Sequence, residues 1–279
     1  MAGQRRVLGR RQLQPAPRRR QRQGQRGQGH GRQRKGFIHH RVSAQASLHD
    51  RFIRELKPGA RLVDADPQVL CSPCDAILGA CGPVQGLTVF QAKGFPYTLP
   101  ELFGADPAAF APYRDGMFAT LRLTSAMYHR FHAPHDLQVH HVTHHSGDTW
   151  NVNPIALKRV QKLFCRNERA VLHCRVGAPG QRAHPLALVQ VAAILVASLR
   201  LHWLPAPLGL DYAGPAQLPC DEPFAKGQEM GWFQHGSTIL VFAPRGFRLA
   251  PGLASGARLR MGQALMHLPD PAAAPVTTM

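Results

Sequence analysis

Two histidines three residues apart are the first feature that could carry chemistry. His129 and His132 lie in the run Tyr128-His129-Arg130-Phe131-His132. Histidine titrates near neutral pH, so either ring could exchange a proton, and the arginine between them could bind an anionic group. The chain has 16 histidines, so a pair of this kind also occurs on ordinary surfaces. By itself the run is only a candidate for acid–base chemistry.

Ser237 and Asp75 are the residues that could complete a nucleophilic site. Ser237 stands between Gly236 and Thr238, before the apolar run 239–242, and Asp75 ends the Ser-Pro-Cys-Asp sequence at 72–75. Serine needs a neighbouring base such as a histidine, and an aspartate can hold that imidazole in the right tautomer. Taken singly, Gly-Ser-Thr also opens ordinary strands, and an Asp at a turn usually bonds its own backbone.

The elements that must position these residues are mostly strands. Short apolar runs alternate with Gly and Pro, and this spacing is typical of a β-rich core; they lie at 86–92, 117–123, 170–176 and 238–242. Helical stretches are few and short, at 99–104 and 154–164. The apolar run 186–199 is shorter than the roughly 20 residues of a spanning helix, and Gln190 favours a buried strand or strand pair there. We expect an α+β fold with one β-rich domain at 46–279.

Residues 1–45 differ from the rest in composition and charge. Residues 1–41 hold 13 of the 34 Lys and Arg residues, and no acidic residue precedes Asp50. The remainder has 34 − 13 = 21 basic and 16 acidic residues, a balance of +5. An Arg/Gln/Gly segment without apolar periodicity cannot offset its ordering entropy, so we expect a disordered tail. It could be a solvated tail, an arm for anionic lipid or nucleic acid, or a start read in the wrong frame.

Metal chemistry is not expected from the remaining histidines and cysteines. The histidines at 135–145 include two pairs four residues apart, which could share a metal on a helix, but Thr143 and the turn at 146–148 favour strand. The Cys-x-x-Cys at 71–74 has no second pair at zinc-ribbon spacing. Six cysteines in 279 residues favour free thiols in a reducing compartment.

Taken together, the motifs identify a family. From about residue 47 to about residue 247 the sequence resembles the bacterial phosphatidylserine decarboxylases. The motifs that carry the resemblance, in the family's order and spacing, are RELKPGAR at 54–61, SPCD at 72–75, QAKG at 91–94, YRDGMF at 113–118, YHRFHAP at 128–134, GDTWNVNP at 147–154, LFCRNER at 163–169, KGQEMGWF at 226–233 and GST at 236–238.

The resemblance implies a proenzyme that cuts itself. Asp75, His132 and Ser237 match the family's serine-protease-like triad, whose serine attacks the carbonyl of the preceding residue, here Gly236. The products would be a β chain of residues 1–236 and an α chain of residues 237–279 that starts with a pyruvoyl group made from Ser237. His129 matches the histidine associated with decarboxylation rather than with self-cleavage.

The cofactor, partners and location also follow from the resemblance. The covalent pyruvoyl group would form a Schiff base with the amine of phosphatidylserine and take up electrons as CO2 leaves, giving phosphatidylethanolamine. The expected partners are phosphatidylserine, a membrane surface and the two chains of one proenzyme, with a homodimer left open. The expected location is peripheral, on the cytoplasmic face of the cell membrane.

Several positions depart from the family pattern. His235 stands in place of the usual Leu, Cys74 in place of Ala and Ala76 in place of Gly, and the basic tail stands where the family usually has apolar or amphipathic helices. The alternative interpretation is a protein that binds nucleic acid or an anionic surface and carries an inactive decarboxylase-like domain. Nucleic acid is the weaker partner because no aromatic residue precedes Phe37 for stacking on bases.

Binding of the chain to anionic vesicles should depend on the tail and on salt. Each basic residue near an anionic surface contributes roughly 1 kcal/mol at best, and the attraction is screened beyond about 8 Å at physiological salt. Sedimentation with liposomes should show binding at low salt that is lost at high salt, and removing residues 1–41 should abolish most of it. Binding that persists in high salt would contradict this expectation and would indicate an apolar contact.

Overall fold

The structure is a computed structural model that describes residues 50, 52–92, 95–177, 183–193, 198–234 and 237–270. These residues all belong to one compact unit. The predicted tail at 1–45 lies outside the described residues, as do His235 and Gly236.

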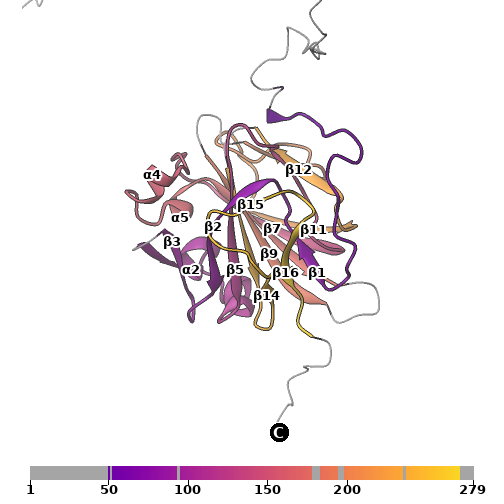
Figure 1. The fold of residues 1–279 in the computed structure, drawn as a ribbon. Helices are drawn as coiled ribbons and strands as arrows, with labels where there is room; N and C mark the ends of the chain where they lie inside the picture. Colours follow the sequence, from indigo (N-terminus) through magenta and orange to yellow (C-terminus); the bar gives the residue numbers. More distant parts are fainter. Residues whose placement is uncertain are drawn as a thin grey trace, which may run out of the picture. The chain divides into compact units, whose positions relative to one another are not determined.

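An antiparallel sheet of eight strands forms the centre of the fold (Figure 1), in the order β11-β7-β8-β9-β13-β5-β2-β15. Its strands, in chain order, are β2 (Ala76–Pro83), β5 (Met117–Leu123), β7 (Leu137–His145), β8 (Arg169–Val176), β9 (His184–Ala192), β11 (Gln217–Phe224), β13 (Ser237–Ala243) and β15 (Arg258–Leu259). Every residue of β13 is buried, because this strand lies between β5 and β9 with a layer on each face.

Smaller elements cover the two faces of this sheet. Three small sheets contain β1 (Val69–Cys71), β16 (Ala264–His267) and β14 (Arg248–Leu249); β10 (Leu199–Leu201), β12 (Glu229–Phe233) and β6 (Arg130–His132); and β3 (Thr88–Ala92) and β4 (Phe95–Thr98). The helices are α2 (Leu99–Phe103), α3 (Pro107–Phe110), α4 (Pro154–Leu157) and α5 (Leu163–Arg166), with a 3-10 turn, η1 (Ala111–Tyr113).

Successive side chains along each strand point to opposite faces of the sheet, so the core is divided into two layers. On one face, residues such as Leu121, Leu188 and Ile239 pack with Phe131 and Phe233 from the sheet of β6, β10 and β12. The opposite face packs against the helical side, where Phe242 meets Phe103 of α2 with ring centroids 5.3 Å apart. Figure 1 shows α2, α4 and α5 gathered on that side.

The predicted fold class is confirmed: the core is β-rich and its helices are short. The apolar runs became β3, β5, β8 and β13, and the run at 186–199 contains parts of two strands, β9 and β10, in different sheets. Among the described residues, no helix combines the length and apolar character needed to cross a bilayer.

Candidate active site

The directions of three strands bring the predicted site residues to one end of the sheet. Arg122 of β5 pairs antiparallel with both Ile77 of β2 and Thr238 of β13, so β2 and β13 run in the same direction. Asp75 directly precedes β2, and Ser237 is the first residue of β13. With about 4.8 Å between neighbouring strands, these two starting points lie roughly 10 Å apart across the end of β5.

The chain leaving β5 at this same end leads directly into the histidine motif. β6 pairs with β12, and Trp232 lies opposite Arg130 while Glu229 lies opposite His132. The Arg130 guanidinium bonds Glu229 at 2.7 Å and lies 5.2 Å from the centre of the Trp232 ring. Two motifs almost 100 residues apart are therefore neighbouring strands, joined by a charge-assisted hydrogen bond.

Backbone hydrogen bonds fix the Asp75 segment beside the histidine motif. The amide of His132 donates to the carbonyl of Pro73 at 2.8 Å, and the amide of Cys71 donates to that of Pro134 at 2.8 Å. These bonds hold the residues before Asp75 against β6 without involving the aspartate side chain.

His132 is a buried neutral base whose tautomer is set by its partners. Its Nδ1 lies 2.8 Å from the carbonyl oxygen of Gly227, which can only accept, so Nδ1 carries the proton. Gly227 has φ +82°, and a β-carbon there would meet Val63 at 2.7 Å, so this turn requires glycine. The basic nitrogen is therefore Nε2, 2.9 Å from the hydroxyl of Tyr128.

Burial determines the protonation of this histidine–tyrosine pair. Desolvation lowers the pKa of His132, an effect that the Gly227 carbonyl and the charges of Glu229 and Asp75 partly oppose. Desolvation also raises the pKa of Tyr128, which therefore stays protonated and donates to Nε2. At neutral pH the imidazole is uncharged and able to accept a proton.

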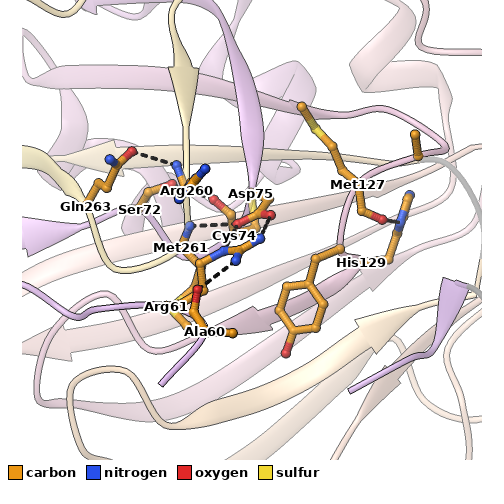
Figure 2. Close-up of polar contacts among 12 residues, drawn as sticks. Ala60, Arg61, Ser72, Cys74, Asp75, Met127, His129, Arg260, Met261 and Gln263 are labelled. Atoms are coloured by element: carbon orange, nitrogen blue, oxygen red, sulfur yellow. Dashed lines mark hydrogen bonds and ion pairs between the residues drawn. The ribbon is translucent and has the colours of Figure 1, made fainter. Parts of the chain in front are cut away.

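Asp75 is held by an arginine and by the C-terminal part of the chain (Figure 2). Its carboxylate accepts hydrogen bonds from Nε of Arg61 at 2.8 Å, from Nη2 of the same guanidinium, and from the amide of Met261 at 3.0 Å. The bond to Asp75 raises the pKa of Arg61. Within the described residues, no hydrogen bond joins Asp75 to His132, so the aspartate acts on the imidazole through its charge.

Ser237 is fully buried at the start of β13, and its Oγ has no hydrogen-bond partner among the described residues. Its neighbours across the sheet are Leu123 of β5 and Ala192 of β9. A buried hydroxyl without a partner costs about 1–3 kcal/mol. The three predicted triad residues thus lie at one end of the sheet, but the structure does not bond them to one another, and their roles stay a prediction.

His129 lies in a separate buried environment (Figure 2). Its Nδ1 is 2.9 Å from the carbonyl oxygen of Met127 and therefore carries the proton, and its ring packs edge-on against Phe52 with centroids 4.6 Å apart. His129 and His132 are three residues apart and make different contacts, which fits different roles.

A cavity of about 250 Å³ opens beside His132. Its lining includes Tyr128 and His132 together with charges of both signs, from Glu55, Lys57, Arg61 and Glu229. A larger cavity of about 670 Å³ contains none of the predicted site residues; it is lined by Phe103 and by several histidines of β7 and β8. Of the four predicted site residues, His132 lines the smaller cavity, together with its partner Tyr128, whereas none lines the larger one.

The histidines of 137–145 lie on strand β7, as predicted, rather than on a helix. In the part of the chain that the structure describes, no group of three or more His, Cys, Asp or Glu residues could hold a metal ion. All six cysteines are free. Burial raises the pKa of the Cys74 thiol well above its usual range, so this neighbour of Asp75 is an inert thiol.

Sequence reasoning missed three groups that shape the site. Arg61 bonds Asp75, Tyr128 bonds His132, and the carbonyl of Gly227 sets the tautomer of His132. All three belong to the motifs at 54–61, 128–134 and 226–233, so the motifs themselves were the available signal.

The comparisons with known proteins all point to the same family. A profile of the phosphatidylserine decarboxylase family matches residues 48–267. The phosphatidylserine decarboxylase proenzyme of Xanthomonas axonopodis pv. citri is 40% identical over 223 residues, which are 77% of this chain and 76% of the relative. The proenzyme of Aliivibrio fischeri is 35% identical over 234 residues, 81% of this chain and 79% of the relative. This chain belongs to the phosphatidylserine decarboxylase family.

Proposed function

We propose that this decarboxylase makes its own catalytic group by cutting the bond between Gly236 and Ser237, and then converts phosphatidylserine to phosphatidylethanolamine. The observation that carries the proposal is the position of Ser237: a buried serine with an unbonded Oγ starts a central strand, at the end of the sheet where Asp75 and the histidine motif also lie. The relatives, whose names call them proenzymes, support it.

Self-cleavage needs a base for the Ser237 hydroxyl. Nε2 of His132 is the unprotonated nitrogen, and it would exchange the Tyr128 hydroxyl for that of Ser237. Hydrogen bonds of catalytic groups are often completed only as the reaction proceeds. When Ser237 gives up its proton, the charge of Asp75 stabilises the imidazolium that forms.

Position 237 suits a pyruvoyl group, because the Oγ of the buried Ser237 has no described partner: the oxygen can leave with Gly236 while the carbons of the residue stay to form the group. When bound, that group supplies a ketone that captures the substrate amine and accepts the electrons released with CO2. His129, with Nδ1 protonated by its contact to Met127, offers Nε2 for moving a proton in the decarboxylation step.

The charged cavity beside His132 suits the head group of the substrate. Phosphatidylserine carries an ammonium, a carboxylate and a phosphate, and the cavity offers Glu55 and Glu229 as well as Lys57 and Arg61. The substrate is a membrane lipid, so we infer that the protein works as a peripheral protein on the cytoplasmic face of the cell membrane.

Purified chain should contain a fragment that starts at position 237 with a blocked N-terminus, as seen by intact-mass measurement. Ser237→Ala should stay uncut, because no nucleophile remains. His132→Ala should cut at least about 100-fold more slowly, the usual contribution of a general base, and Asp75→Asn should also be slower. His140→Ala, on the exposed side of β7, is the matched control and should cut normally. Uniformly intact wild-type protein of 30.7 kDa would falsify self-cleavage.

The pH dependence of cleavage should follow the depressed pKa of His132. The base must be neutral, and burial lowers its pKa below the ordinary value of about 6.5. The pH at which cleavage falls to half its plateau rate should therefore lie below 6.5, because the imidazole gains its proton only there. Rates followed on denaturing gels test this, and a decline centred above pH 6.5 would rule out a buried, desolvated His132 as the base.

His129→Ala should separate the two reactions. The variant keeps Ser237 and His132, so it should cut to the same two fragments, but release of CO2 from phosphatidylserine should fall by about 100-fold or more. Mass measurement and CO2 release on the same sample give both results. If the processed variant decarboxylates at the wild-type rate, His129 has no part in the reaction.

A further inference from the structure

Gln190 is a buried polar side chain that the proposed mechanism does not use. It lies in the middle of β9 among apolar residues, with no exposed surface, and neither its Oε1 nor its Nε2 has a hydrogen-bond partner among the described residues. Buried amides are normally bonded, so this one requires an explanation.

The strand register places Gln190 beside the proposed nucleophile. Gln190 lies opposite Ile239, and Ser237 lies opposite Ala192, so Gln190 and Ser237 are diagonal neighbours on adjacent strands. Residues two apart on a strand share a face. Diagonal neighbours lie about 7–8 Å apart, within reach of a long side chain. Two buried polar groups without described partners therefore lie on one face of the sheet as diagonal neighbours, without a hydrogen bond between them.

The surroundings leave the carboxamide few other acceptors. A small void of about 10 Å³ is lined by Gln190 and by Ala192, the cross-strand partner of Ser237. Leu199 and Leu208 form an apolar wall of the same void. The carboxylate of Glu168, also in the lining, already bonds the His144 ring and the amide of Gly147.

The chemistry of self-cleavage creates an acceptor at this place. The Ser237 oxygen bonds to the carbonyl carbon of Gly236, its proton passes to Nε2 of His132, and the electron pair of the carbonyl moves onto its oxygen. Both oxygens are then bonded to one carbon, so the oxyanion forms next to the serine oxygen, within the diagonal spacing that a long side chain such as Gln190 can span. Collapse breaks the C–N bond, the nitrogen takes the proton from His132, and an ester remains.

We propose that the Gln190 carboxamide donates a hydrogen bond to this oxyanion and so accelerates the cleavage before Ser237. The inference rests on the proposed function, because it assigns Gln190 a role in that self-cleavage. Gln190 is then a catalytic residue of the self-cleavage. It lies on β9, in the part of the sequence that becomes the β chain, next to β13, and the cut falls just before β13.

Two variants of the proenzyme test the proposal by the rate of cleavage on denaturing gels. Gln190→Met keeps the length of the side chain but cannot donate, and it should cut about 100-fold more slowly, the usual effect of losing one oxyanion donor. Thr120→Val is the matched control. It removes a different buried polar group without a described partner, the Thr120 hydroxyl, from the opposite face of the sheet, and it should cut at the wild-type rate. Wild-type cleavage by Gln190→Met overturns the inference, whereas failure of the wild-type chain to cut refutes self-cleavage itself.

The Gln190→Glu variant tests whether the side chain at position 190 donates a hydrogen bond or only supports the structure. A buried carboxyl group can donate only while it is protonated, so cleavage of this variant should slow as pH rises through the pKa of the new group. The wild type should hold its rate there, because its base stays neutral. A Gln190→Glu variant whose pH profile parallels that of the wild type would show that no proton is donated from this position.

Discussion

The site depends on the pairing of β5 with two strands at once. Because Arg122 pairs with both Ile77 and Thr238, β2 and β13 must start at the same end of the sheet. A slip of one residue in β13 would turn Ser237 to the opposite face, toward the helical layer and away from β6. The burial of every β13 residue makes such a slip costly, so the packing of the strand fixes the orientation of the serine.

Asp75 and His132 are held in separate, satisfied contacts, whereas the Oγ of Ser237 has no described partner. Asp75 forms an ion pair with Arg61, and His132 is bonded at both ring nitrogens by neutral partners. Asp75 is the buried member of this pair, and the amide of Met261 supplies one more hydrogen bond to its carboxylate. A neutral His132 avoids burying a further charge, and the proposed self-cleavage would create that charge only as the reaction proceeds.

Much of the fold followed from local sequence, whereas the contacts of the site did not. The apolar runs and turn residues predicted the central strands, and the motif spacing identified the family and its candidate residues. The partner of Asp75 could not be predicted, because Arg61 lies 14 residues away across a turn whose path depends on tertiary packing. Gln190 was visible as an interruption of an apolar run, but its position beside Ser237 depends on the register of β9 and β13, which periodicity alone does not give.

The central position of β13 bears on how the protein would unfold after the proposed cut. The C-terminal piece keeps β13 hydrogen-bonded to β5 and β9, β15 to β2, and β16 to β1, so both pieces share one core. The intact chain can refold as a single molecule at any dilution. After the proposed cut, the same core would re-form only when two molecules meet, and Ser237 would no longer exist to restore the link. A two-chain enzyme made in this way would have a lifetime set by how slowly it unfolds, because each unfolding event in dilute solution would be effectively final.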